Sequence, residues 1–248
     1  MEPVFRSLEI AAKSLVAITG MCINYQGLEH IPADGGAVIA INHTGYVDFL
    51  PAGLAATRRK RRIRFMLKAE VRKFPVMGFL INRAKLIPVD RSAGGDAYPV
   101  AVQKLRDGEL VGVYPEATIS RSFELKDFKT GVARMALDAG VPIIPVVVWG
   151  VHRVWTKDHP KSLGRKKIPV SVLVGAPIPA AGSVQDILDE LRAVMTAQLY
   201  AAQGAYPHPE GEYWVPHRLG GGAPTLEEAQ VLDKAELADR ARKSAEGR

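Results

Sequence analysis

The sequence contains a single cysteine, Cys22, among its 248 residues. One thiol cannot close an internal disulfide, which excludes the class of small secreted domains that depend on disulfides. Cysteines and histidines with the spacing of metal ligands are also lacking, and we expect no metal site. A GxSxG motif is absent as well, so the sequence offers no nucleophile elbow of the serine hydrolase type.

The sequence also lacks long apolar runs. No stretch reaches the roughly 20 consecutive apolar residues that a helix needs to cross a bilayer. The N-terminus lacks a signal-peptide pattern, because Arg6, Glu9 and Lys13 interrupt its apolar residues. We therefore expect a peripheral or monotopic protein at the cytoplasmic face of the cell membrane.

The composition is that of a globular protein. Apolar residues make up 47% of the chain and charged residues 24%, which allows a packed core and excludes wholesale disorder. Short β-branched apolar runs alternate with helical patterns along the chain, and several of these runs carry no polar face. This pattern predicts an α/β fold with a mixed, largely parallel sheet flanked by helices.

The two ends of the chain differ from its middle. Apolar residues recur near a 3.6-residue period over residues 4–23, and the polar face disappears in the second half. This favours a membrane-associated helix that lies in the lipid interface; the alternative is an ordinary helix packed on its own domain. We divide the chain into an interfacial helix at 1–26, an α/β domain at 27–203, and a Gly/Pro-rich loop with a polar tail at 204–248.

Positive charge is in excess, with a net charge of +7. Six of the seven positions 58–64 are Lys or Arg, and a second basic group occupies 161–167. Such a balance points to an anionic partner: a membrane surface, a phosphorylated or CoA-type substrate, or nucleic acid. A solvated face is the alternative. No helix-turn-helix, RNP or aromatic pattern accompanies the cations, so we expect an anionic membrane surface and no nucleic acid.

His43 and Asp48 carry the most specific chemical signal. A histidine can take a proton from an attacking hydroxyl near neutral pH. A carboxylate that accepts the Nδ1 hydrogen fixes the tautomer of the ring and stabilises its protonated form. Five residues of spacing let both side chains meet where a strand leads into a helix. Without an activated Ser or Cys nucleophile, the pair favours direct attack by a hydroxyl of the substrate.

Four sequence blocks give this pair a context. In order along the chain they resemble the four blocks of the 1-acylglycerol-3-phosphate acyltransferase (PlsC-like) family. The first resembles NHxxxxD, the third resembles FPEGTRS, and the fourth is an apolar V-P-I-x-P strand. The blocks are NHTGYVD (42–48), FMLKAEVRKFPVMGFLINRAKLIPVDR (65–91), VYPEATISRS (113–122) and VPIIPVVVWG (141–150).

The resemblance implies roles for individual residues. His43 would be the general base and Asp48 its orienting carboxylate. The donor would be an acyl-CoA or acyl carrier protein thioester, the acceptor a lysophospholipid, and no cofactor would be needed. Backbone amides after His43 or near the third block are candidates for oxyanion donors. The residues assigned to substrate binding are Asn42, Lys68, Arg91, Glu116, Thr118, Arg121 and Ser122.

The third block departs from the family pattern. Ala117 stands where the family has glycine, so a left-handed backbone there becomes less favourable. Ile119 and Ser120 separate Thr118 from Arg121. The function implied is acylation of the sn-2 hydroxyl of 1-acylglycerol-3-phosphate, giving phosphatidate. The altered block keeps one alternative open, the same chemistry on another lysophospholipid or glycolipid. The excess of positive charge keeps a second, a non-catalytic protein that binds lipid or nucleic acid through its basic face.

Overall fold

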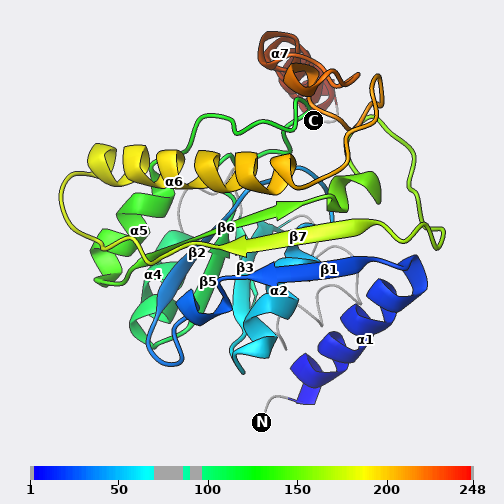
Figure 1. Ribbon diagram of the computed structural model, residues 1–248. Coiled ribbons are helices and arrows are strands. Elements are labelled where there is room, and N and C mark those ends of the chain that lie inside the picture. Colours follow the sequence, from blue (N-terminus) through cyan, green and yellow to red (C-terminus); the bar gives the residue numbers. More distant parts are fainter. Residues whose placement is uncertain (1–2, 70–85, 90–96, 247–248) are drawn as a thin grey trace.

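Seven strands form the sheet at the centre of the molecule (Figure 1). The computed structural model describes residues 3–69, 86–89 and 97–246. The strands lie in the order β1-β7-β6-β2-β5-β3-β4. Their bounds are β1 Cys22–Gln26, β2 Ala37–Ile41, β3 Ile63–Lys68, β4 Ile87–Val89, β5 Leu110–Val113, β6 Ile143–Trp149 and β7 Pro169–Val174.

The pairing of these strands confirms the predicted mixed, largely parallel sheet. β6, β2, β5, β3 and β4 run parallel to one another. β7 is antiparallel to β6, and β1 pairs with β7 in parallel. Every residue of β2 and of β6 is buried, because helices cover both faces. This is why both strands are continuous apolar runs with no alternation of polar residues.

Helices divide between the two faces of the sheet. The side chains of α1 and α2 share one apolar core with one face, and those of α4, α5 and α6 share a second core with the other. Figure 1 shows α6 running across the face opposite to α1 and α2. The bounds are α1 Pro3–Thr19, α2 Phe49–Arg58, α4 Ala97–Arg106, α5 Gly131–Ala139, α6 Val184–Gly204 and α7 Leu226–Glu246.

The carboxyl ends of β2, β5 and β6 meet at one edge of the sheet, because these strands are adjacent and parallel. His43 follows β2, Tyr114 follows β5, and Gly150 follows β6. In open α/β sheets this edge is where ligands bind. The fold thus brings the first, third and fourth sequence blocks together.

The N-terminal helix is shorter than predicted. α1 ends at Thr19, and Gly20 then adopts a left-handed conformation with φ 67°. Residues 22–26 form β1, whose pairing with β7 makes them part of the sheet, so a boundary at residue 26 does not separate helix from domain. Periodicity missed this because a short apolar edge strand continues the apolar pattern of the helix. Among the described helices, none has the length and apolar character needed to cross a membrane.

The basic run does not form one surface. Arg61 donates hydrogen bonds to three backbone carbonyls, at Pro32, Gly35 and Gly108. Arg64 is buried and pairs with Glu109 at 2.9 Å. These arginines hold turns of the protein together. The run also lies at the amino-terminal edge of the sheet, since Ile63 pairs with Leu110 at the start of β5.

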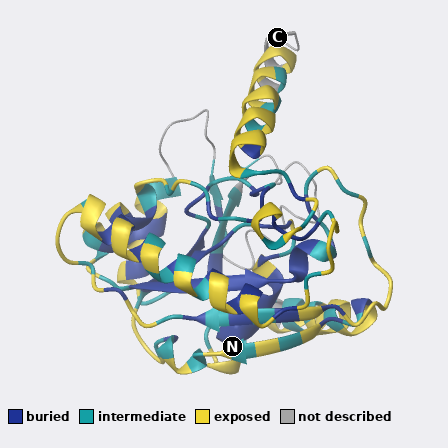
Figure 2. Ribbon diagram, turned by 45° about the horizontal axis from the view of Figure 1, so that its top comes forward, coloured by how far each residue is buried: buried dark blue, intermediate teal, exposed yellow. Residues whose placement is uncertain are grey.

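The polar tail in the C-terminal region forms a helix, α7. α7 projects from the body of the protein (Figure 2). It begins with a reciprocal cap, in which Thr225 N donates to Glu228 Oε2 at 2.9 Å and Glu228 N donates to Thr225 Oγ1 at 3.2 Å. The loop before it is anchored by the buried Trp214 and Val215.

Candidate active site

His43 and Asp48 meet as their spacing predicts. His43 Nδ1 lies 3.0 Å from Asp48 Oδ2. A carboxylate can only accept, so the hydrogen sits on Nδ1 and Nε2 is left as the proton acceptor. Asp48 is fully buried, whereas the His43 side chain is 18% exposed. The arrangement therefore presents a basic nitrogen at the surface, held from behind by a buried anion.

Asp48 also organises the backbone around the histidine. Its Oδ2 accepts hydrogen bonds of 2.8 Å from the amides of Thr44 and Gly45. Gly45 is required by space, because a Cβ there would lie 2.8 Å from the carbonyl oxygen of Trp155. Since both amides are occupied by Asp48, neither is free to serve as an oxyanion donor. The expected donors after His43 are thus excluded at these two positions.

Tyr114 is a site residue that we did not assign from the sequence. Its ring stacks on His43 with 4.0 Å between centroids and an interplanar angle of 18°. The contact fixes the plane of the imidazole, and the face of an aromatic ring attracts a cation. The signal was present, since this tyrosine stands at the aromatic position that opens the third block.

Glu116 binds the protein itself rather than lying open to a ligand. Its Oε1 accepts from the His43 amide at 2.8 Å and its Oε2 from the Lys126 amide at 3.0 Å. Burial raises the pKa of this carboxyl to about 8, against the opposing effect of the two amide donors. The structure therefore gives Glu116 a positioning role: it ties the loop after β5 to the backbone of His43.

Two other predicted binding residues are buried in the framework. Asn42 donates to Val148 O at 3.1 Å and accepts from Val148 N at 2.7 Å, which joins the ends of β2 and β6. The Ser122 hydroxyl lies 3.1 Å from that of Ser120 and accepts from the Glu124 amide. Both side chains are buried and bond to other groups of the protein, so they support the site from within the fold and are not exposed to a ligand.

The loop of the third block carries the strain that its sequence predicts. Ala117 has φ 60°, a left-handed conformation that is unfavourable for a residue with a Cβ. Ile119 is buried, and the Ser120 amide donates to His43 O at 2.8 Å. The loop thus buries the apolar side chain of Ile119, and the arginine of the third block, Arg121, follows two residues later.

Arg121 lies in a cage of carboxylates. It donates to Asp158 at 2.5 Å and to Glu236 at 2.9 Å, and its Nη1 donates to Asp233. Only 9% of its side chain is exposed. Asp233 and Glu236 belong to α7, so the polar tail reaches the third block, a contact that sequence reasoning missed.

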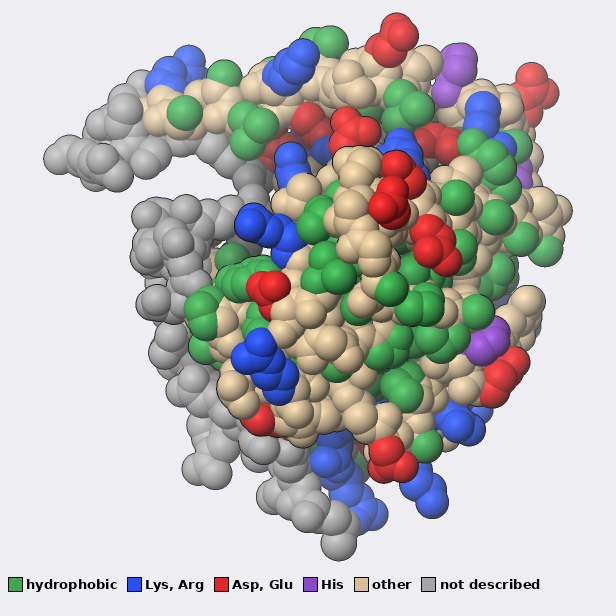
Figure 3. Space-filling model, turned by 90° about the vertical axis from the view of Figure 1, so that its left-hand side faces the viewer, with side chains coloured by type: hydrophobic (Ala, Val, Ile, Leu, Met, Phe, Trp, Pro, Cys, Tyr) green, Lys and Arg blue, Asp and Glu red, His purple; other side chains and the backbone are tan. Residues whose placement is uncertain are grey.

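Two lysines join Arg121 in this cluster. Lys126 donates to Asp233 and, at 2.7 Å, to the Thr118 hydroxyl. Lys157 donates to Glu236 at 2.8 Å. In Figure 3 the C-terminal helix runs along the top of the molecule, and acidic and basic side chains lie side by side just below it. Of the remaining predicted residues, Arg91 and the side chain of Lys68 lie outside the described residues.

The fold and the hydrogen-bonded His43–Asp48 pair together define a candidate active site at the carboxyl edge of an α/β sheet. A family model described as Acyltransferase matches residues 22–149. The chain belongs to this acyltransferase family.

Several relatives of this chain share one name. The chain is 28% identical over 190 residues to 1-acyl-sn-glycerol-3-phosphate acyltransferase of Bacillus subtilis (strain 168), covering 76% of this chain and 89% of that protein. A protein of the same name from Limnanthes douglasii is 28% identical over 186 residues. The match covers 71% of this chain and 61% of the Limnanthes protein. The crystal structure of the 1-acyl-sn-glycerophosphate (LPA) acyltransferase PlsC from Thermotoga maritima matches with a TM-score of 0.69 at 22% identity, covering 82% of this chain and 81% of that one. The fold is therefore that of PlsC.

Proposed function

We propose that this enzyme transfers an acyl group from an acyl-CoA or acyl carrier protein thioester to the sn-2 hydroxyl of 1-acyl-sn-glycerol-3-phosphate, forming phosphatidate. One observation carries the proposal: a partly exposed His43 whose Nδ1 is held by the buried Asp48, which leaves Nε2 as the proton acceptor. The family membership supports the reaction type, and the names of the relatives support the acceptor.

The reaction follows from the orientation of the histidine. The acceptor hydroxyl attacks the thioester carbonyl carbon while His43 Nε2 takes the hydroxyl proton. The imidazolium that forms is stabilised by the Asp48 carboxylate and by the face of Tyr114. The tetrahedral intermediate then collapses, the C–S bond breaks, and the leaving thiolate takes the proton back from His43. Among the described hydrogen bonds, none joins His43 to a Ser or Cys side chain, which supports direct transfer without an acyl-enzyme.

The phosphate group distinguishes 1-acylglycerol-3-phosphate from the phosphate-free lipids that could be acceptors instead. We expect Arg121→Ala to lower kcat/KM for 1-acylglycerol-3-phosphate about 10- to 150-fold, because a charge-assisted hydrogen bond contributes roughly 1.5–3 kcal/mol. Most of the loss should appear in the acceptor KM, and the KM of the thioester should stay near its original value. Steady-state kinetics with each substrate varied in turn checks this. Arg91→Ala is the parallel variant from the second block.

Two controls accompany the arginine variants. Arg59→Ala removes an exposed arginine at the opposite edge of the sheet and should leave the kinetics unchanged. A monoacylglycerol without phosphate should be a poor substrate and insensitive to the substitutions. If the phosphate-free acceptor is the better substrate and neither Arg91 nor Arg121 matters, the alternative acceptor is correct. This alternative is tested because Ile119, which is buried, lies between Thr118 and Arg121 and alters the third block.

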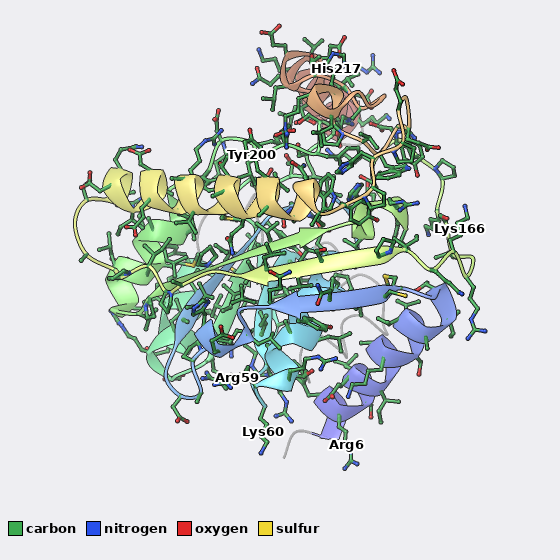
Figure 4. The ribbon with its side chains drawn as sticks, in the orientation of Figure 1. Arg6, Arg59, Lys60, Lys166, Tyr200 and His217 are labelled. Atoms are coloured by element: carbon green, nitrogen blue, oxygen red, sulfur yellow. The ribbon has the colours of Figure 1, made fainter. Side chains whose placement is uncertain are left out.

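We further propose that the protein works at a membrane surface, on its cytoplasmic face. Exposed apolar side chains along α1, at Ile10, Leu15 and Ile18, support a lipid contact. The end of α1 adjoins the second basic group, because Cys22 N donates to Ile168 O at 2.9 Å. That group belongs to the connection that leaves the carboxyl end of β6, the edge that carries His43. Figure 4 shows Lys166 pointing outward there, whereas Arg59 and Lys60 point outward from a different part of the molecule.

Two sets of variants test this surface. We expect Ile10→Glu/Ile18→Glu to lower binding to liposomes at least tenfold, since burying one such side chain contributes about 1.5–3 kcal/mol. Lys166→Glu/Lys167→Glu should weaken binding to anionic vesicles but not to neutral ones, and 0.5 M salt should remove the difference. Vesicle co-sedimentation measures both effects. Val231→Glu on the exposed face of α7 is the matched control; equal binding by every variant would exclude this surface as the lipid contact.

A further inference from the structure

The cluster of Arg121, Lys126 and Lys157 has an unusual origin. Its cations come from the two loops that follow β5 and β6, yet two of the three carboxylates that pair with them come from the C-terminal helix. Asp233 contacts Arg121 and Lys126, and lies 3.7 Å from Lys157. Three cations that converge on a carboxylate of a separate element make a site suited to an anion.

Hydrogen bonds join both loops to the backbone beside His43. The Ser120 amide donates to His43 O at 2.8 Å, one residue before Arg121. The Thr156 hydroxyl donates to Thr44 O at 2.7 Å, one residue before Lys157. The cationic cluster is therefore built on the same segment that positions the catalytic base, as a binding site for the charged group of the acceptor requires.

α7 is held on this cluster by ion pairs rather than by apolar packing. Among its described side chains, Ala229 alone is buried, and Asp233 and Glu236 are partly buried on the same face at i+4 and i+7. The contact is therefore mainly ionic, with little apolar area, and it is made by carboxylates that pair with the same cations an incoming anion would contact. The reciprocal cap at Thr225 and Glu228 belongs to the helix itself, so α7 can leave the cluster without losing its own start.

We propose that Asp233 and Glu236 of α7 are internal competitors of the acceptor: they occupy the cations around Arg121, together with Lys126 and Lys157, and the acceptor phosphate must displace them. The inference rests on the proposed function. With α7 in place, three cations face three carboxylates, counting Asp158. When α7 leaves, an excess of positive charge remains for a phosphate that carries nearly two negative charges.

The first experiment removes the competing charges. Asp233→Asn/Glu236→Gln keeps the shape of both side chains but should lower the KM for 1-acylglycerol-3-phosphate about tenfold with kcat unchanged. The reason is that apparent affinity is reduced in proportion to the fraction of molecules whose site is open, so a tenfold change corresponds to a wild-type site that is open in about one molecule in ten. Glu227→Gln/Asp239→Asn removes two charges from the same helix away from the cluster and should leave the acceptor KM as it is. An equal KM for the wild type and Asp233→Asn/Glu236→Gln would overturn the proposal.

The second experiment uses the unaltered protein and does not depend on turnover. Lys234 and Arg242 place trypsin sites in α7. Glycerol 3-phosphate in large excess should raise the rate of cleavage within residues 226–246 at least threefold, because a displaced helix frays more readily than a seated one. Glycerol with sodium chloride at matched ionic strength should not. Unchanged or slower cleavage with glycerol 3-phosphate would contradict the displacement.

Together the two experiments separate this inference from the proposed function. If the wild type acylates 1-acylglycerol-3-phosphate but neither the variant nor glycerol 3-phosphate has the expected effect, the function stands and the inference fails. If the wild type does not use this acceptor, the proposed function fails, and the cleavage experiment still decides whether a phosphate displaces α7.

Discussion

His43→Ala is expected to reduce acyl transfer about 10²- to 10⁴-fold while leaving the fold intact. The side chain is partly exposed and its ring rests on Tyr114, so its loss removes the proton acceptor without opening the core. The amide and carbonyl of residue 43, which bond to Glu116 and Ser120, remain in place. The effect should appear in kcat, because the base acts on the hydroxyl during the reaction itself.

The measurement is the initial rate of thiol release from an acyl-CoA in the presence of acceptor, together with the melting temperature of each variant. His217→Ala removes an exposed histidine of the C-terminal region and is the matched control. A well-folded His43→Ala protein that retains near-normal turnover would rule out the general-base mechanism. A variant with a much lower melting temperature would be replaced by His43→Gln, for which the same loss is expected.

Asp48→Asn has the second large effect, a loss of about 10²- to 10⁴-fold in kcat. The Oδ2 atom of Asp48 accepts from His43, Thr44 and Gly45 together. A carboxamide can turn its oxygen to these donors, which preserves the loop but removes the charge that stabilises the imidazolium. If it turns its nitrogen to His43 instead, it favours the wrong tautomer. Either orientation weakens the base.

Kinetics and stability must be measured together for this variant, because Asp48 is fully buried. Asp34→Asn, at an exposed turn before β2, is the control for loss of one carboxylate. We expect Asp48→Asn to melt within a few degrees of the wild type. A folded Asp48→Asn protein with nearly full activity would mean that the carboxylate holds the loop and contributes nothing to proton transfer.

Much of the fold could be predicted because its strands are apolar on both faces. The runs that form β2 and β6 have no polar alternation, a pattern of central parallel strands, and both are fully buried. The end of α1 could not be predicted in this way. β1 is short, and its place in the sheet depends on pairing with β7, which follows it by more than 140 residues.

The position of the His43–Asp48 pair could be predicted for a related reason. His43 follows a buried strand and Asp48 precedes a helix, so local sequence alone sets their distance. The other site residues depend on partners far along the chain. Asn42 bonds to Val148, and Arg121 bonds to Asp233. From their residue types we predicted that these side chains bind substrate. Only the tertiary structure shows that other groups of the protein bond to them.

The most direct test of the account is the identity of the product. Purified protein would be incubated with an isotopically labelled acyl-CoA and 1-acyl-sn-glycerol-3-phosphate, and the lipids analysed by mass spectrometry. We expect phosphatidate that carries the labelled chain at sn-2, formed in equal amount to the CoA released. CoA release without labelled phosphatidate, or labelling of phosphate-free acceptors alone, would contradict it.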